Sequence, residues 1–432
     1  FVVSIHITCT IDLLVEFIYV LYLKIYYKMK KNNLLILTQY FPPDVSGGAT
    51  RAFNYSKCLA QQNYNVTVIT AHPHQHEPVP KNYRNKLTKK EKYDNLNLIR
   101  VWIPSLLHSS IKNSAILNFS FCISSLFPLF SIKSKPDVII AFEPNLFSII
   151  PAYFYSKLRG GIVIRIVDDM WPELLYEQKI LKSNFLKKIL TSLAKFSYNY
   201  SKHIIPLNNE VKELIHNSYG INNDKIDAIS HGIDEKKFTF IKKERQKIFT
   251  LMYSGSLNTT YDFDIIINAA KNLKDKNIQF IIRGKGKQLS YIQKQKAKFK
   301  IDNLIIDSNF VPIEKLSSIL SKSDVLLIPM RKGDSLNTSL PTKILESQAI
   351  GRAIICCSSG AIGNYVKSTN SGICVDEEDI DGFVNAILKL ESNDKLCQEF
   401  GQNGRKFIEK NHTFEIIGST LSSIIQKRLQ NF

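Results

Sequence analysis

The sequence predicts an α/β protein made of two doubly wound domains that face a central cleft. From residue 34 onward, short apolar runs of strand length alternate with amphipathic segments of helical period. This series occurs twice along the 432 residues, which is also more chain than one ordinary domain uses. Because parallel strands are buried between two helical layers, they read as continuous apolar runs of this kind.

The predicted elements follow this alternation in order. Strand candidates of the first series lie at Leu34–Leu37, Val66–Thr70, Leu98–Trp102, Val138–Ala141, Ile162–Val167 and His203–Leu207. Those of the second series lie at Ile226–Ile229, Thr250–Tyr253, Ile278–Ile282, Leu304–Ile306, Val325–Ile328, Ala353–Cys356 and Gly372–Val375. Helical patterns lie at Ala49–Gln62, Phe185–Tyr200, Phe263–Leu273, Ile313–Leu320, Ile380–Leu390, Leu396–Lys410 and Phe414–Leu429. Ligands of such sheets bind at the carboxyl ends of the strands, so function is expected in the loops that follow them.

Four segments are expected along the chain. They are an apolar extension at residues 1–28, a first domain at 29–225, a second domain at 226–410, and a terminal helix at 411–432 that crosses back to the first domain. Within the extension, Leu13–Tyr27 is either a translated upstream region, with Met29 as the true start, or a membrane anchor. A signal peptide fits least, because a basic n-region and a small-residue cleavage site are missing.

The composition favours an anionic partner. A net charge of +19 and a pI of about 9.4 suit nucleic acid, an acidic membrane surface or a phosphate-bearing substrate, although a general bias toward Lys and Asn is the plainer explanation. The lysines are scattered and no nucleic-acid-binding motif is present, so we expect no nucleic-acid partner. None of the seven cysteines pairs at metal-ligand spacing, which indicates reduced thiols in a cytoplasmic protein and no metal site.

The turn and helix around Pro341 are the strongest functional signal. Ser339 and Leu340 form the turn, and Pro341 suits the first turn of a helix because its missing N–H is not needed there. A helix N-terminus attracts phosphate, and Lys343 adds a cation. Glu346, about one turn further in, can accept hydrogen bonds from sugar hydroxyls. Phosphate and hydroxyls recognised by one such unit describe a nucleotide sugar.

Two loops of the first series carry further candidates. Gly47 and Gly48 allow close backbone approach to an anion or a sugar, although a plain strand-helix turn has the same form. After a later strand, Asp169, Trp171 and Glu173 form either a hydroxyl-binding or acid/base cluster, or a capped helix start with a packed Trp.

Three loops of the second series carry candidates as well. His231 lines the cleft near the hinge or, as is commoner for a lone His, is structural. Gly255 opens a small-residue loop whose backbone can pass close to a diphosphate. Arg283 leads a Gly-Lys-Gly loop that suits either a solvated turn or a phosphate clamp.

The order of these motifs is more specific than any one of them. The chain contains in succession Gln-Tyr-Phe-Pro-Pro…Gly-Gly, Asp-Met-Trp-Pro-Glu, His-Gly-Ile-Asp, Tyr-Ser-Gly-Ser-Leu, Gly-Lys-Gly, Ser-Leu-Pro-Thr-Lys-Ile-Leu-Glu and Gly-x-x-Gly-Arg. This succession resembles glycosyltransferase family 4, and within it the O-antigen and capsule subgroup with an Asp-Leu-Trp-Pro-Glu motif. The resemblance runs from about residue 29 to the end of the chain.

The resemblance implies the GT-B fold, in which two Rossmann-like domains enclose the active site. It implies retaining transfer of a hexosyl or N-acetylhexosaminyl group from a nucleotide sugar to a glycan or polyprenyl-linked glycan in cell-surface polysaccharide synthesis. The nucleotide sugar is a co-substrate, and no other cofactor and no essential metal are expected. Two alternatives stay open: a sugar-nucleotide epimerase of the same fold, and a non-catalytic nucleotide-sugar-binding protein.

The resemblance also implies roles for single residues. Glu346 matches the Glu that binds the donor ribose, and Asp169 lies near the transferred sugar; these two are the predicted catalytic residues. Thr338 stands where relatives often carry a further Glu, which weakens the expected contact with the donor sugar. The other expected donor-side residues are Gly47, Gly48, Gly255, Arg283, Val311, Ile313, Ser339, Leu340, Pro341 and Lys343, and the acceptor-side residues are Trp171, Glu173 and His231.

A membrane-bound acceptor suggests where the protein works. Ala115–Ile132 is strongly apolar, and Lys81–Lys92 is basic. Together they are expected to dock on an anionic membrane, which places the protein in the cytoplasm at the inner face of the cell membrane. The alternative for Ala115–Ile132 is a buried helix of the first domain.

Overall fold

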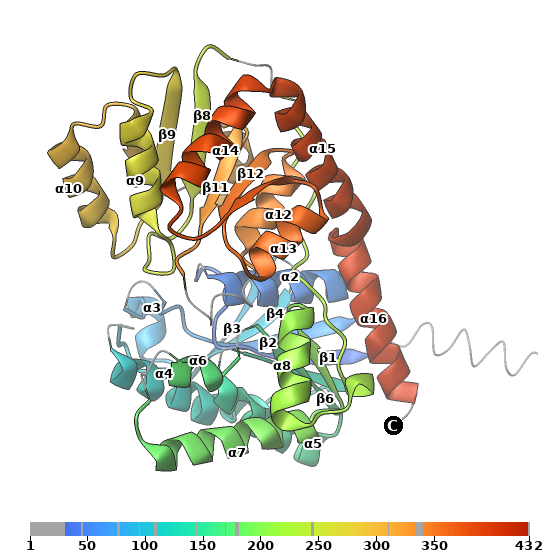
Figure 1. Ribbon diagram of the computed structural model, residues 1–432. Coiled ribbons are helices and arrows are strands. Elements are labelled where there is room, and N and C mark those ends of the chain that lie inside the picture. The colour runs from blue at the N-terminus through green and yellow to red at the C-terminus, as the bar shows by residue number, and fades with distance from the viewer. Residues whose placement is uncertain are drawn as a thin grey trace, which may run out of the picture.

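The computed structural model describes residues 31–44, 46–75, 78–94, 96–107, 110–143, 145–168, 170–177, 181–242, 246–309, 311–332 and 340–430. Within them the chain forms two α/β domains, each built on its own sheet (Figure 1). The predicted fold class is confirmed: both sheets are predominantly parallel and carry helices on their faces.

The first sheet has the strand order β3-β4-β2-β1-β5-β6-β7. Its strands are β1 (Asn33–Leu37), β2 (Asn65–Ala71), β3 (Thr88–Tyr93), β4 (Leu96–Val101), β5 (Val138–Phe142), β6 (Ile162–Val167) and β7 (His203–Pro206). Neighbours pair in parallel apart from β3 and β4, which are antiparallel. The strand order reverses between β1 and β5, and at such a switch point parallel sheets bind ligands.

Strand β3 is absent from the sequence prediction. Lys89, Lys90 and Lys92 fill half of it, and most of its side chains are exposed. It is an edge strand, and charged residues on an edge prevent pairing with other chains. A search for apolar runs therefore cannot find it. Much of the basic region Lys81–Lys92 consequently belongs to α3 (Lys81–Arg84) and to this sheet edge.

Two helical layers cover the first sheet. One face carries α4 (Ile111–Ser124), α5 (Ile149–Arg159) and α7 (Asn184–Tyr200), which share a core with the sheet side chains that point toward them. The other carries α2 (Gly47–Gln61) and α16 (Phe414–Gln430). The remaining elements are α6 (Glu173–Glu177), α8 (Asn209–Tyr219), η1 (Phe127–Phe130), η2 (Leu146–Ser148) and η3 (Asn223–Lys225).

The second sheet has the strand order β10-β9-β8-β11-β12-β13. Its strands are β8 (Phe249–Ser254), β9 (Ile278–Arg283), β10 (Leu304–Asp307), β11 (Val325–Pro329), β12 (Ala353–Cys357) and β13 (Gly372–Val375). Its helices are α9 (Phe263–Asn272), α10 (Leu289–Phe299), α11 (Ile313–Leu320), α12 (Thr342–Ala349), α13 (Ala361–Ser368), α14 (Ile380–Ser392) and α15 (Asp394–Asn411). The order reverses between β8 and β11, so its switch point lies beside α12.

One predicted strand is wrong. Ile226–Ile229 forms no strand, and only Ile226 makes a bridge, to Ile204. Its apolar side chains are buried because this segment leaves the first domain between packed elements. The same connection continues to Ile233, which forms a parallel bridge with Thr413. The two chain crossings between the domains therefore lie side by side.

The terminal helix returns to the first domain. α15 and α16 run along one side of the molecule, and α16 packs on α2 (Figure 1). Phe414, Ile417, Leu421 and Ile425 recur at helical spacing and join the core of the first sheet. The last helix thus ties the two domains together by apolar burial.

We predict that Leu421→Ala lowers the free energy of unfolding by about 2–5 kcal/mol, because a buried leucine is replaced by a cavity. Urea unfolding measures it. Ser423→Ala on the exposed side of the same helix is the matched control, with a change within about 0.5 kcal/mol. Equal effects of the two substitutions would show that α16 is not packed as described.

Candidate active site

The loop after β1 presents an open helix N-terminus. Ser46 caps α2 by accepting a hydrogen bond from Ala49 N at 3.2 Å. Gly47 is exposed, and a Cβ added there meets nothing within 4 Å. Gly48 is half-buried beside it. The space beside Gly47 and the free backbone N–H groups of the first turn together suit an anion. In Figure 1, α2 lies along the boundary between the two domains.

Arg51, one turn into α2, is fully buried and joins three distant segments. Its Nη1 donates to Val167 O at 3.2 Å and forms an ion pair with Asp168 at the end of β6. Its Nη2 donates to Ile229 O at 2.7 Å, in the connection between the domains. A buried charge is tolerated only with such partners. Sequence reasoning missed Arg51, although it follows the glycine pair by one helical turn.

The connection between the domains is held from both sides. From α2, Asn54 Nδ2 donates to Gly232 O at 2.8 Å, and the Tyr55 hydroxyl donates to Ile229 O at 2.9 Å. From the end of α15, His412 Nδ1 donates to His231 O at 3.0 Å. The path of the connection is thereby fixed relative to α2.

His231 lies inside this connection and is almost fully buried. Burial lowers the pKa of His231, and the charge of Arg51 lowers it further, while a hydrogen bond to the backbone of Leu340 opposes the shift. The imidazole ring of His231 is therefore neutral. It lies between the connection of the two domains and Leu340, which precedes α12. The structural alternative for His231 is therefore the better description, and a direct contact with an acceptor stays a prediction.

The described carboxylates of the loop after β6 have partners within the protein. Asp168 is paired with Arg51, and Glu173 accepts a hydrogen bond from the Tyr219 hydroxyl. Asp169, the predicted catalytic carboxylate, lies outside the described residues. Trp171 is half-buried, and its Nε1 has no hydrogen-bond partner in the described part of the chain. The indole N–H of Trp171 is itself buried, so its contact with an acceptor stays a prediction.

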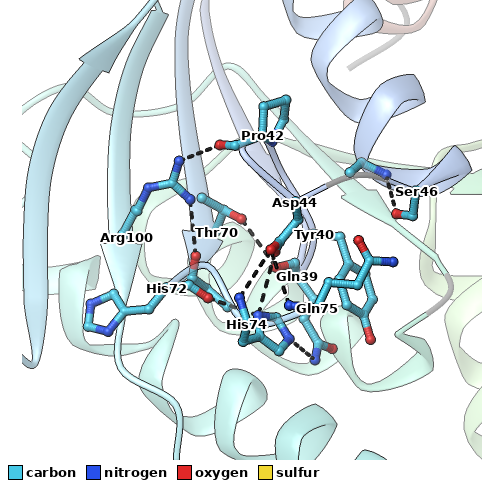
Figure 2. A network of polar contacts seen from close by, with 12 residues as sticks. Gln39, Tyr40, Pro42, Asp44, Ser46, Thr70, His72, His74, Gln75 and Arg100 are labelled. Carbon is cyan, nitrogen blue, oxygen red and sulfur yellow. Dashed lines mark hydrogen bonds and ion pairs between the residues drawn. The ribbon is translucent and has the colours of Figure 1, made fainter. Parts of the chain in front are cut away.

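A buried polar network lies at the switch point of the first sheet, where the loops after β1, β2 and β5 meet. Figure 2 shows the part of it that lies in the loops after β1 and β2. Asn145 Nδ2 donates to Gln39 Oε1 at 2.7 Å, and Gln39 Nε2 contacts His74 Nε2 at 3.3 Å. Asp44 Oδ1 accepts from the backbone N of His74 at 3.1 Å, and the Tyr40 ring stacks on His74. The sequence analysis missed this network, because its members are single polar residues spread over three loops.

The second domain offers two loops that approach each other unusually closely. Gly255 N donates to Arg283 O at 2.9 Å, which extends the pairing of β8 and β9 beyond the strands. Gly284 has φ +144, and a Cβ there would lie 1.7 Å from Gly255 O. Gly286 has φ +155, and its Cβ would lie 2.3 Å from Leu257 O. Glycine is therefore required at both positions to let the backbones meet.

Lys343 of α12 lies against Gly255. A Cβ added to Gly255 would come within 2.6 Å of Lys343 Nζ. Lys343 Nζ donates to the Tyr261 hydroxyl at 3.0 Å and stands 4.7 Å from the centre of that ring and 5.7 Å from that of Tyr253. The aromatic rings and the hydroxyl hold this cation in place before any ligand arrives.

Glu346 lies on α12, half-buried near Lys343. Burial raises the pKa of Glu346, while the charge of Lys343 and a hydrogen bond from the Thr342 side chain lower it. Pro341 is the N-cap of α12, so the helix itself begins at Thr342 and not at the proline. Among the described residues, no side chain caps this terminus. Leu340 is buried. The structure thus brings Gly255, Lys343 and Glu346 together.

The other predicted donor-side residues divide into three groups. Arg283 is 6% exposed, and its guanidinium binds Asp307 Oδ2 at 3.1 Å and Asn309 O at 2.8 Å, so its charge is matched within the protein. A buried and paired guanidinium of this kind does not suit a phosphate clamp. Val311 is half-exposed after β10, and Ile313 begins α11. Thr338 and Ser339 lie outside the described residues.

Comparison with known proteins assigns the chain to a family. A model of glycosyltransferase family 4 matches residues 45–237, and a model of the group 1 glycosyl transferases matches residues 234–407. The two matches cover both domains. The chain belongs to the family 4 glycosyltransferases.

Curated relatives of this glycosyltransferase have low sequence identity to it, and two of the matches cover most of both chains. An uncharacterised glycosyltransferase of Methanocaldococcus jannaschii is 22% identical over 90% of this chain and 96% of its own. The WcaI protein of Escherichia coli K12, named provisionally as a colanic acid biosynthesis glycosyl transferase, is 23% identical over 86% of this chain and 95% of its own. An Escherichia coli UDP-Gal:alpha-D-GlcNAc-diphosphoundecaprenol alpha-1,3-galactosyltransferase is 27% identical over 52% of this chain and 60% of its own.

Solved structures show that this glycosyltransferase has the GT-B fold. Sucrose-phosphate synthase of Thermosynechococcus elongatus matches with a TM-score of 0.75 at 13% identity, covering 93% of this chain and all of that one. The Anabaena protein HepE, solved in complex with UDP, matches with a TM-score of 0.61 at 11% identity, covering 92% of this chain and all of that one. At this level of identity the likeness is one of fold.

No group of three His, Cys, Asp or Glu side chains that could hold a metal ion occurs among the residues that the structure describes. The expectation that this glycosyltransferase works without an essential metal stays a prediction. What the described site does contain is a pre-positioned cation that lies against the half-buried Gly255, a neighbouring carboxylate, and an exposed backbone approach at Gly47.

We predict that Arg51→Met lowers the free energy of unfolding by about 3–5 kcal/mol, because it leaves the carboxylate of Asp168 buried without its partner. Adding Asp168→Asn to this variant is expected to restore part of the loss. Chemical denaturation measures both effects.

The exposed ion pair of Arg405 and Glu409 provides the control. Glu409→Gln is expected to cost less than about 1 kcal/mol. If Arg51→Met lowers the free energy of unfolding by as little as Glu409→Gln does, the buried ion pair does not organise this region.

Proposed function

We propose that the protein is a retaining glycosyltransferase that moves a sugar from a nucleotide-sugar donor to a glycan or lipid-linked glycan acceptor in cell-surface polysaccharide synthesis. The grouping of Gly255, Lys343 and Glu346 carries the proposal. It joins a backbone that a diphosphate can approach, a fixed cation that can neutralise it, and a carboxylate that can accept hydrogen bonds from hydroxyls. A nucleotide sugar needs these three kinds of contact.

The first domain supplies the other side of the proposed site. The open N-terminus of α2 at Gly47 suits the donor phosphates. We assign the acceptor to the loops of the same domain, where the network of Gln39, His74 and Asn145 fixes the loop backbones. Asp169 keeps its proposed place beside the transferred sugar on the strength of the family motif.

In the proposed reaction, the bond between the sugar C1 and the diphosphate oxygen breaks, and a bond from C1 to the acceptor oxygen forms on the same face. The proton of the acceptor hydroxyl passes to the departing diphosphate. Negative charge grows on the departing diphosphate. Lys343 and the backbone N–H groups at the start of α2 stabilise it, and because they are already held in place they need no rearrangement. Each such donor typically lowers the barrier by about 3–4 kcal/mol.

The comparisons support the proposal on the choice of substrates. The name of one relative specifies a UDP-sugar donor and a diphosphoundecaprenol-linked acceptor, and HepE was solved with UDP. We propose the same classes here: a nucleoside diphosphate sugar, and a glycan or polyprenyl-linked acceptor. A thermal-shift panel of nucleotide sugars selects the donor, because a ligand at 100 times its Kd stabilises by about 2.7 kcal/mol.

We predict that Glu346→Gln reduces kcat/KM for sugar transfer by at least about 100-fold while the thermal midpoint stays unchanged, because a half-exposed carboxylate is replaced by its neutral isostere. Transfer of radiolabel from the selected donor to a polyprenyl-diphosphate glycan measures it. Glu399→Gln on the exposed surface of α15 is the control. Unchanged transfer by Glu346→Gln sinks the assignment.

The same assay separates the two alternatives. An epimerase converts the donor without any acceptor present, and a binding protein shifts the thermal midpoint but neither transfers nor hydrolyses the donor. Radiolabel in the lipid-linked product excludes both.

We predict that Gly47→Ala preserves stability, because its new methyl group meets no protein atom. The methyl group is expected to displace a donor phosphate from the N–H groups beside it. This raises KM for the donor about 10- to 100-fold, as the loss of a hydrogen bond to a charged group does. Steady-state kinetics measure the effect. An unchanged KM would remove the α2 N-terminus from the donor site.

A further inference from the structure

The layer of α4, α5 and α7 has an apolar outer side. Helices that cover a sheet normally turn a polar face to solvent. Here large apolar side chains recur at helical spacing on the exposed sides: Ile116, Phe119 and Ile123 on α4, and Phe185, Ile189 and Phe196 on α7. Between these two helices, Phe154 and Leu158 of α5 are exposed as well. We call the outer side of α4, η1, α5 and α7 the aromatic face.

Ring contacts join neighbouring elements of the aromatic face. Phe119 of α4 meets Phe147 with 6.4 Å between ring centroids. Tyr153 of α5 meets Phe196 of α7 at 5.8 Å and Tyr200 at 4.9 Å. The three helices lie together on the side of the first domain that is turned away from the second domain (Figure 1). Whatever binds there leaves the boundary between the domains accessible.

The charges of the aromatic face have one sign. The three helices contain no Asp or Glu over their whole length. Their cations are Lys112, Lys157, Arg159, Lys187, Lys188 and Lys195. On α7, Lys188 and Lys195 lie directly beside the stripe of Phe185, Ile189 and Phe196.

The apolar residues protrude as well as cluster. Phe130 is 86% exposed and Phe185 is 72% exposed. The stretch Lys112–Phe130 is long and apolar enough to cross a membrane by length and composition, yet only 39% of it is buried. Leu117 and Phe121 pack it onto the sheet, so its position is on the surface of a folded domain.

We propose that the aromatic face docks this protein onto an anionic lipid surface. Exposed rings and aliphatic side chains enter the boundary of headgroups and acyl chains, and the surrounding lysines bind the lipid phosphates. A second copy of the chain is a poorer occupant, because a symmetric pairing would bring like charges together. The proposal does not depend on which sugar the enzyme transfers.

This assignment changes what the sequence suggested. Of the two segments expected to reach a membrane, Ala115–Ile132 supplies α4 and η1 of the aromatic face. Lys81–Lys92 belongs to α3 and the edge strand β3 instead. The cations of the docking surface come from α5 and α7, which sequence reasoning did not connect with it.

Vesicle flotation of the full-length chain tests the proposal, using phosphatidylcholine vesicles with and without phosphatidylglycerol. Because the chain also carries the apolar segment Leu13–Tyr27, the variants decide the outcome. Lys188→Glu with Lys195→Glu is expected to weaken binding to the anionic vesicles at least tenfold, since each cation near such a surface contributes about fivefold. Phe130→Ser with Phe185→Ser is expected to weaken it similarly.

The matched controls lie in the second domain. Lys294→Glu with Lys298→Glu on α10 makes the same change in net charge, and Ile305→Ser removes an exposed apolar side chain. Both are expected to leave flotation unchanged. Binding should also weaken as the Debye length falls from about 10 Å at 0.1 M salt to about 3 Å at 1 M.

Three results overturn the proposal. The first is that the control variants and the aromatic-face variants reduce flotation equally. The second is that flotation needs no anionic lipid. The third is that the protein is a dimer in lipid-free solution, and that Phe130→Ser with Phe185→Ser dissociates this dimer while flotation persists. None of these variants touches the proposed donor site, so sugar transfer to a soluble acceptor stays at the wild-type level if the docking surface alone is affected.

Discussion

The buried guanidinium of Arg51 is the constraint on which the arrangement of the two domains rests. It links α2, the end of β6 and the connection between the domains, three segments that are far apart in the chain. A fully buried cation costs several kcal/mol in desolvation, and only the ion pair with Asp168 and the carbonyl acceptors offset it. These same segments carry Gly47, the Asp169 loop and His231. One charge therefore fixes the relative positions of the residues that the first domain offers to the site.

The two crossings between the domains lie side by side. Ile233 and Thr413 pair where the outgoing and returning chains pass each other, and His412 holds the carbonyl of His231 beside them. A pair of short adjacent segments of this kind can absorb the backbone rotations of a hinge. Beyond it, the apolar contacts of α16 keep the second domain tethered to the first.

Residue patterns predicted the parts of the molecule that depend on local chemistry. Val138–Phe142 reads as a strand because all its side chains are apolar, and the turn before α12 reads as a helix start because of Pro341. Strand β3 escaped prediction because its lysines suit an edge. Arg51 and the network of Gln39, His74 and Asn145 escaped because their partners come from distant loops. Arg283 is the opposite case, because the sequence around it suits a phosphate clamp. In the structure its guanidinium forms an ion pair with Asp307 on a neighbouring strand instead.

In the proposed reaction both domains act on one nucleotide sugar, and the sugar is transferred with retention. The anomeric configuration of the product tests this most directly. A glycan formed from the selected α-linked donor is isolated, and the proton coupling constant at the new glycosidic carbon is read by NMR. Retention gives an α-linked product from the α-linked donor. A β-linked product, or a free sugar as the only product in the presence of acceptor, would contradict it.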